Sequence, residues 1–320
     1  MSNFLHISSI RLLSISTTII AGALVTSLFV NSSDPIKIGE EERFEEMFTK
    51  YYSIHALPIP KEMSFANESV PLNKTYVRES LDREILVNTY WQSQTLLLIK
   101  RSHRYFPIIE PILKAEGIPD DFKYLALIES GLMPRVVSPA GAAGIWQFMP
   151  DAARDYGLEV NKEVDERYHV EKSTVAAGKY LKKAYEKYGS WALAAAAYNA
   201  GSAGINRHLE KQKTNNYYDL LLGEETGRYV YRILAIKRIV EEPQSYGFHL
   251  APEDLYRPID CFEIEIDSAV ANFADFAIEQ GITYRELKDM NPWLRETYLT
   301  NATEKTYKLK IPRPGAFTVE

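Results

Sequence analysis

A single carboxylate, Glu129, stands at the end of a segment that is otherwise apolar. Residues 122–128 are apolar on nearly every side of a helix, which is typical of a buried helix. Pro119 and the two acids after it predict the helix start. Gly131 predicts the helix end, because glycine accepts the left-handed conformation that closes many helices. The spacing therefore places Glu129 on the last turn.

A carboxylate at that position should resist ionisation. Apolar neighbours and the negative end of its own helix both disfavour the charged form, so we expect the pKa of Glu129 to be raised. Such a group can donate a proton near neutral pH. The simpler interpretation is an ion pair with a base such as Arg135, or exposure to solvent, and the helix alone favours it.

The segment after the acid has the composition of a sugar-binding site. Residues 138–144 are small, so that the backbone can pass close to a ligand, and residues 145–150 (IWQFMP) add aromatic rings and an amide. Sugar sites use flat apolar faces against the ring and polar groups for its hydroxyls. Trp146 and Phe148 can equally be core residues, and we expect at least one of them to be core.

An alanine-rich helix must then position a third motif. Small side chains over residues 191–198 let this helix approach its neighbours closely, which would bring Tyr198 and Asn199 to the same cleft. The alternative is that the alanines only favour helix formation and that Tyr198 is core. Downstream, residues 225–231 open another helix, which continues to Ile239.

Three motifs in this order resemble the catalytic domain of soluble-type lytic transglycosylases. They are IESG at 128–131, GAAGIWQFMP at 141–150 and AYNAG at 197–201. The pattern is most similar to the murein transglycosylase D branch of that family, where the glutamine motif carries a tryptophan and LysM modules follow. Three ordered motifs are far more specific than any one of them.

The resemblance implies a fold and a set of roles. The fold would be mainly α, with a lysozyme-like catalytic domain, a helical N-terminal lead-in and a small βααβ LysM-like C-terminal module. Glu129 would be the catalytic acid, Tyr229 would hydrogen-bond to it, and no cofactor or metal would be needed. The residues implied in substrate binding are Ser138, Gln147, Phe148, Met149, Tyr198 and Asn199. Tyr231 and Arg232 are expected to be packing and surface residues.

Hydrolysis of a glycosidic bond by the usual routes takes two carboxylates, and the sequence offers one convincing candidate. The downstream acids Asp151, Asp155 and Glu159 have no spacing that specifies a partner for Glu129. One acid suffices when the substrate supplies the nucleophile. Glu129 would protonate the oxygen between N-acetylmuramic acid and N-acetylglucosamine and then deprotonate the 6-hydroxyl, giving a 1,6-anhydro end.

Two alternative functions are compatible with the sequence. A goose-type lysozyme would use water instead, and a peptidoglycan-binding protein without catalysis is the second alternative. The six histidines form no close pair and no phosphate-loop pattern occurs, so metalloenzyme and nucleotide-binding functions find no support. A net charge of −6 offers no general attraction to nucleic acid.

The N-terminal part of the chain predicts export. Residues 7–30 are apolar or small with Arg11 as the only formal charge, so residues 1–33 are predicted to be a signal peptide or membrane anchor. The remainder would lie in the periplasm or cell envelope, with peptidoglycan glycan strands as its partner and membrane association through the N-terminal segment. Residues 34–71 read as a tether with one short helix near 41–51.

The whole chain of 320 residues is 46% hydrophobic and 25% charged, and two folded units are expected after the tether. A helical lead-in would occupy residues 72–116 and the catalytic domain residues 117–250. Alternating apolar residues predict two strands around two short helices over 258–315, the LysM order. This module lacks the usual early glycine-aspartate-threonine element, so its binding to glycan stays open. The lone Cys261 is predicted to be a small buried apolar residue.

Overall fold

The computed structural model describes residues 42–43, 45–46, 50 and 54–318. The predicted export segment and most of the short helix near 41–51 lie outside these residues. Residues 57–320 form one compact unit. In the part of the chain that is described, no helix combines the length and the apolar character needed to cross a membrane.

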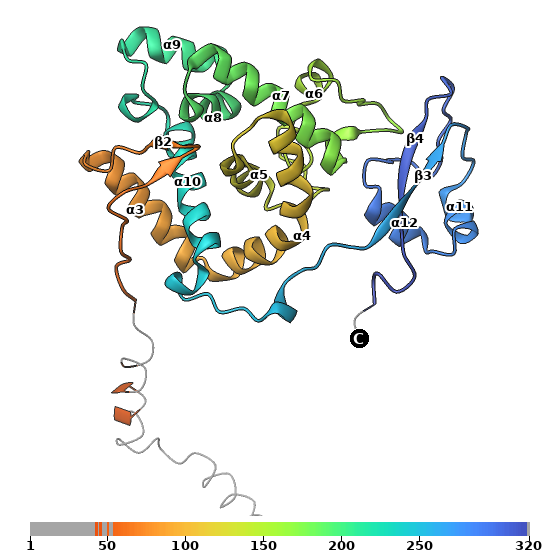
Figure 1. Ribbon diagram of the computed structural model, residues 1–320, viewed down its shortest axis with the longest axis horizontal. Coiled ribbons are helices and arrows are strands. Elements are labelled where there is room, and N and C mark those ends of the chain that lie inside the picture. The colour runs from red at the N-terminus through yellow and green to blue at the C-terminus, as the bar shows by residue number, and fades with distance from the viewer. Residues whose placement is uncertain (1–41, 44, 47–49, 51–53, 319–320) are drawn as a thin grey trace, which may run out of the picture. The chain divides into compact units, whose positions relative to one another are not determined.

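The fold is mainly helical, as predicted. In chain order the α-helices are α3 (Thr75–Tyr90), α4 (Gln92–Glu116), α5 (Lys123–Ser130), α6 (Pro150–Asp155), α7 (Val170–Tyr188), α8 (Trp191–Ala200), α9 (Ser202–Gln212), α10 (Glu224–Glu241), α11 (Phe273–Glu279) and α12 (Tyr284–Met290). Figure 1 shows α5 in the middle of the helical part, and α4 and α10 pack against it. Short 3-10 turns connect the helices at η1 (Asp120–Phe122), η2 (Glu166–Tyr168), η3 (Tyr217–Asp219), η4 (Pro243–Tyr246) and η5 (Pro252–Asp254).

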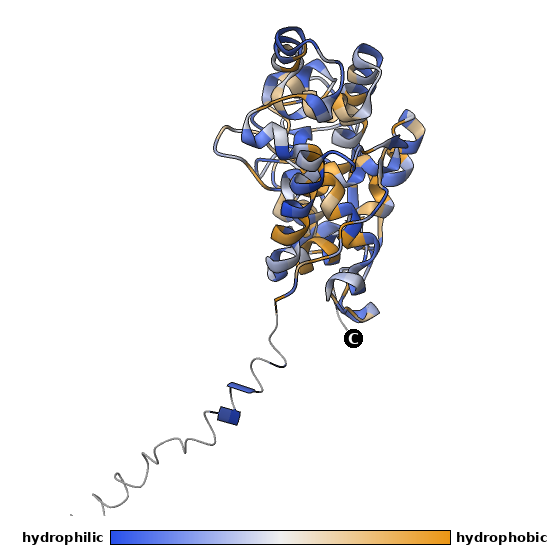
Figure 2. Cartoon of the chain, turned by 90° about the vertical axis from the view of Figure 1, so that its left-hand side faces the viewer, coloured by the Kyte–Doolittle hydropathy of each residue, from blue (hydrophilic) through white to orange (hydrophobic). Residues whose placement is uncertain are grey.

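One apolar core runs through the whole helical part. Leu125 and Leu127 of α5 are fully buried in it, together with Leu81 of α3 and Ile236 of α10. Figure 2 shows the apolar segments gathered toward the middle of these helices. The predicted lead-in and the predicted catalytic domain therefore share a single core. Burial of this apolar surface is the main term that stabilises the arrangement.

The expected tether is wrong over its last residues. A short hairpin, β1 (Ser64–Phe65) and β2 (Glu68–Ser69), closes a turn in which Ala66 and Asn67 have positive φ. Phe65 is fully buried and its ring lies 5.3 Å from that of Phe122. The Glu68 carboxylate accepts hydrogen bonds from the backbone at the start of α8, where the helix dipole favours a negative charge. The prolines near this segment suggested a tether. The turn contains no glycine that would have predicted a hairpin.

Helix α4 continues through two prolines, Pro107 and Pro111, and ends at Gly117, where φ is +73°. Proline removes one backbone hydrogen bond and usually interrupts a helix. Here Phe106, Ile109 and Leu113 are buried on the inner face, so packing holds the helix together across both prolines.

The C-terminal module has the predicted strand–helix–helix–strand order. Strand β3 (Cys261–Ile266) pairs antiparallel with β4 (Tyr307–Pro312), with Ile264 opposite Leu309. The helices α11 and α12 lie between the strands in sequence, and Asn291 after α12 is fully buried. Its amide bonds to the backbone nitrogen and oxygen of Lys310, which ties the end of α12 to β4.

The module also packs on the segment before α7. Val164 forms an isolated antiparallel bridge with Leu294, and the backbone nitrogen of Asp165 donates to the carbonyl of Trp293 (2.9 Å). Ala143 and Val164 of the helical part are buried in one cluster with Phe273 and Leu287 of the module. The module is therefore packed against residues that neighbour the glutamine motif.

Candidate active site

Glu129 lies on the last turn of α5, as its spacing predicted. Gly131 follows with φ +60°, and Leu132 with φ +53°, so two consecutive left-handed residues turn the chain away from the helix axis. This conformation is strained for Leu132, whose side chain is fully buried. The turn leaves the Glu129 side chain partly buried at the end of an apolar helix.

Burial raises the pKa of Glu129 above its usual value, and two partners oppose that rise. The hydroxyl of Tyr229 donates a hydrogen bond to Oε1 of Glu129, and the positive charge of Arg232 lies near enough to favour the carboxylate. Tyr229 is buried, and burial raises the pKa of its own hydroxyl well above the usual range. Tyr229 therefore remains a proton-bearing donor. Glu129, whose charged form is disfavoured by burial and favoured by two partners, can give up a proton and then be stabilised as an anion.

Sequence reasoning missed two charged neighbours of the acid. Glu225 raises the pKa of Glu129 by repulsion, and Arg232, expected to be a surface or packing residue, lowers it. Arg232 also donates a hydrogen bond to the carbonyl of Ile128 (3.2 Å). Both lie on α10 at four residues before and three residues after Tyr229, so all three share one face of the helix. That spacing is the signal by which the sequence could have found them.

The glutamine motif forms a compact loop. The hydroxyl of Ser138 accepts from the backbone nitrogen of Ala142 (3.0 Å), and Ala143 pairs with Phe148 through two backbone hydrogen bonds. Gln147 has φ +52°, an uncommon conformation for this residue type. Its amide nitrogen donates to the carbonyl of Gly144 (2.7 Å), so the amide oxygen is the group that can face a ligand.

The buried ion pair between Arg167 and Asp165 supports this loop. The guanidinium of Arg167 bonds to both carboxylate oxygens of Asp165, and it also donates to the carbonyls of Gly141 (2.9 Å) and Phe148 (3.1 Å). Gly144 has φ +78°, and a Cβ atom there would lie 1.8 Å from the carbonyl oxygen of Arg167. Only glycine fits so close to another backbone. The loop conformation thus depends on residues outside the motif.

Tyr198 and Asn199 sit at the end of α8 and connect it to its neighbours. The Tyr198 hydroxyl donates to the carbonyl of Trp146 (2.7 Å), and burial followed by the nearby charge of Glu129 raises its pKa well above the usual range. The Asn199 amide nitrogen donates to Glu225 (3.1 Å), and its oxygen accepts from Thr226 (2.8 Å). Both side chains therefore belong to the surroundings of Glu129.

The aromatic residues of the loop divide between core and surface. Trp146 is fully buried and its indole nitrogen donates to the hydroxyl of Thr174 (2.8 Å). Phe148, predicted to bind substrate, is only 4% exposed and packs edge-on against Tyr198. Met149 is 46% exposed. Of these three side chains, only Met149 offers appreciable surface to a ligand.

Two of the three downstream acids named in the sequence have partners of their own. Asp151 pairs with Arg154 at 2.9 Å, and Glu159 pairs with Lys305 and accepts from the hydroxyl of Tyr307. Arg135, the base that could have neutralised Glu129, pairs instead with Asp289 at 3.0 Å. The ordinary surface ion pair is therefore not the state of Glu129.

An open hollow of about 540 Å³ between α3 and α10 is lined by Glu225 and Arg232, the two residues whose charges act on Glu129. The exposed indole of Trp91 contributes to the same hollow. Its floor is fixed by the buried Glu84, which pairs with Arg228 at 2.6 Å. A flat aromatic face beside polar groups is suited to a sugar ring.

The class of domain follows from family comparison. Residues 106–221 match the transglycosylase SLT domain, and residues 262–315 match the soluble lytic transglycosylase C-terminal LysM-like domain. The chain therefore carries an SLT domain followed by a LysM-like domain. The SLT match includes Glu129, the glutamine loop, Tyr198 and Asn199. It ends before Tyr229.

Among individual proteins, the chain is similar to membrane-bound lytic murein transglycosylase D of Escherichia coli K12. The two are 29% identical over 228 residues, which is 70% of this chain and 49% of that protein, and the same protein of strain O6:H1 gives the same values. The chain thus spans about half the length of the curated relatives it matches. The crystal structure of the 70 kDa soluble lytic transglycosylase of E. coli overlaps with a TM-score of 0.40 at 18% identity, covering 57% of this chain and 32% of that one.

Proposed function

We propose that this protein is a lytic transglycosylase that cleaves peptidoglycan between N-acetylmuramic acid and N-acetylglucosamine. The observation that carries the proposal is the state of Glu129, a partly buried acid of raised pKa that accepts a hydrogen bond from Tyr229. The curated relative from E. coli K12 is by name a lytic murein transglycosylase. Such a substrate would place the protein in the cell envelope.

The reaction needs one group that is first an acid and then a base. Protonated Glu129 gives its proton to the glycosidic oxygen while the bond from that oxygen to C1 of N-acetylmuramic acid breaks. The Glu129 carboxylate then takes the proton of the 6-hydroxyl, and the 6-oxygen bonds to C1. The product is a 1,6-anhydro end, and no water is consumed.

The neighbours of Glu129 fit the second half of this sequence. When Glu129 has lost its proton, the Tyr229 hydroxyl and the Arg232 charge both stabilise the carboxylate. Positioned acid–base catalysis contributes roughly 10²–10⁴ in rate, or about 3–5 kcal/mol of the barrier. The remaining stabilisation would come from substrate contacts, for which we propose Ser138, Gln147, Met149, Tyr198 and Asn199. Phe148 would act by supporting Tyr198.

Hydrolysis by a goose-type lysozyme route is the second candidate, and one observation favours it. Glu225 is a second carboxylate whose charge reaches Glu129, so it could activate a water molecule. Glu225 is exposed and its carboxylate is held by Asn199, which points to a role in the substrate groove. The two routes differ in whether Glu225 is essential.

Two matched variants test the proposal. Glu129→Gln should lower the rate of peptidoglycan cleavage at least a hundredfold while circular dichroism shows an unchanged fold. Glu225→Gln, which keeps an acceptor for Asn199, should retain cleavage and the anhydro product. Unchanged cleavage by Glu129→Gln would mean that another group does the chemistry. Loss of cleavage in the single variant Glu225→Gln, in addition to the loss in Glu129→Gln, would favour hydrolysis.

A further inference from the structure

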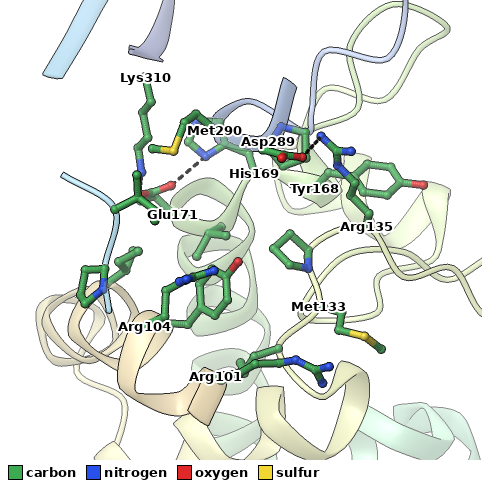
Figure 3. A pocket seen from close by; sticks show the side chains of 18 of the residues that line it. Arg101, Arg104, Met133, Arg135, Tyr168, His169, Glu171, Asp289, Met290 and Lys310 are labelled. Atoms are coloured by element: carbon green, nitrogen blue, oxygen red, sulfur yellow. Dashed lines mark hydrogen bonds and ion pairs between the residues drawn. The ribbon is translucent and has the colours of Figure 1, made fainter. Parts of the chain in front are cut away.

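A cavity of about 510 Å³ separate from the Glu129 site lies between α4, the turn after α5 and the C-terminal module (Figure 3). Leu132 and Met133, which follow the turn at Gly131, line one side of it. Much of the wall is apolar, and its members from the module side include Ile259, Met290 and Trp293. Glu129 is not among the lining residues. The cavity is large enough for a short peptide and begins three residues beyond the proposed acid.

The charges around the cavity are not balanced. Two carboxylates line it and both are neutralised: Asp289 by Arg135, and Glu171 by Lys310, with His169 Nδ1 3.2 Å from Glu171. These contacts lower the pKa of Glu171 to about 2, although burial opposes that change. Figure 3 shows both carboxylates across the cavity from Arg101 and Arg104.

Arg101 and Arg104 supply the excess positive charge. They are three residues apart on α4 and therefore lie on the same face of the helix. Arg101 donates to the carbonyl of Gly131 (3.2 Å), and Arg104 donates to the carbonyl of Arg257 (2.9 Å) and lies over the ring of Tyr256. Within residues 54–318, neither guanidinium has a carboxylate within ion-pair distance. Two cations beside an apolar wall are a site for an anion that carries apolar groups.

We propose that this cavity binds a short peptide through a free carboxylate, held by Arg101 and Arg104 with its apolar groups against Ile259 and Trp293. The proposal rests on the proposed function in one respect: the natural ligand would be the peptide that peptidoglycan carries on N-acetylmuramic acid. Inorganic phosphate is disfavoured because it carries no apolar groups that could contact Ile259 and Trp293. The bound peptide would help to hold the glycan chain at the neighbouring Glu129 site.

Direct binding to the full chain tests the site without any cleavage. The probes are acetyl-Ala-Glu-Ala with a free C-terminal carboxylate, the same peptide with both carboxyl groups amidated, and inorganic phosphate as competitor. In titrations followed by NMR, the free acid should bind at least tenfold more tightly than the amide. Arg104→Gln should remove that difference, whereas Arg78→Gln, on an exposed position of α3, should keep it. Equal binding of both peptides, or complete displacement by equimolar phosphate, would overturn the proposal.

Cleavage assays separate this proposal from the proposed function. Peptidoglycan is compared with the same glycan after an amidase has removed its peptides. Arg104→Gln should raise KM severalfold on the peptide-bearing substrate and leave KM on the bare glycan unchanged, with kcat unaffected. A wild-type protein that cleaves neither substrate but binds the free-acid peptide through Arg104 would refute the function and keep the site. Normal cleavage by Arg104→Gln with equal KM on both substrates would refute the site alone.

Discussion

Replacing Arg167 by methionine should destabilise the fold strongly, because this arginine is the buried partner of Asp165 and the support of the glutamine loop. The side chains of Arg167 and Asp165 are 10% and 8% exposed. Removal of one partner from a buried ion pair typically costs about 3–5 kcal/mol, since the other charge is left unpaired. The carbonyls of Gly141 and Phe148 lose their donor as well. We expect a loss of unfolding free energy in that range.

The assay is urea unfolding followed by circular dichroism, with equal slopes required before midpoints are compared. Arg154→Met is the matched control, because Arg154 also pairs with an aspartate two to three residues away but is 52% exposed, with its partner Asp151 97% exposed. Surface pairs of this kind contribute little, so this variant should stay close to wild type. The double variant Arg167→Met, Asp165→Asn should recover part of the loss, because it no longer buries a lone charge.

The same substitution should also affect catalysis. Gln147 belongs to the loop that Arg167 holds, so Arg167→Met should lower kcat/KM at a temperature where the variant is fully folded. Unfolding of Arg167→Met at the same urea concentration as Arg154→Met would contradict a stabilising role of the buried pair. A double variant less stable than Arg167→Met would show that the cost does not arise from the unpaired aspartate.

Three further predictions concern the acid and its loop. Tyr229→Phe removes a hydrogen-bond donor that lowers the pKa of Glu129, so the alkaline limb of the pH profile of kcat/KM should move to higher pH. An alkaline limb that does not move would show that this hydrogen bond does not act on the catalytic proton. Gly144→Ala should prevent soluble expression or lower the melting temperature far more than Gly141→Ala, because only the first places a Cβ atom against the Arg167 carbonyl; equal melting temperatures would contradict this. Burial raises the pKa of Glu129 in the folded protein above its pKa in the unfolded chain, so the wild type loses stability as the pH rises through the folded-state pKa. Glu129→Gln should therefore raise the melting temperature at pH 8 and give a smaller gain at pH 4, and a gain independent of pH would count against the burial of a charge.

Local signals account for what could be predicted from the sequence. The helix that carries Glu129 ends at Gly131 because a glycine there accepts a left-handed conformation, a preference that needs no tertiary context. The alternation at Ile264 and Leu309 likewise predicts strands from the pattern alone. The raised pKa of Glu129 followed from its apolar helix.

Contacts between distant segments account for what could not be predicted. Arg167 holds carbonyls that lie 19 and 26 residues earlier in the chain, and nothing in the spacing of Gly141 and Phe148 points to that arginine. Likewise, the turn at Ala66 is stabilised by a bond from its backbone nitrogen to Asp121 (2.7 Å), far along the chain. Such partners are set by packing, to which local propensity is a weak guide.

The most direct test of the central claim is the mass of the muramic ends released from peptidoglycan in water enriched in ¹⁸O. If Glu129 works alone with the 6-hydroxyl as nucleophile, each new end is lighter than a reducing end by one water and carries no label. Reducing ends that contain one ¹⁸O atom each, lost in Glu129→Gln, would show that water is the nucleophile and would contradict the proposed reaction.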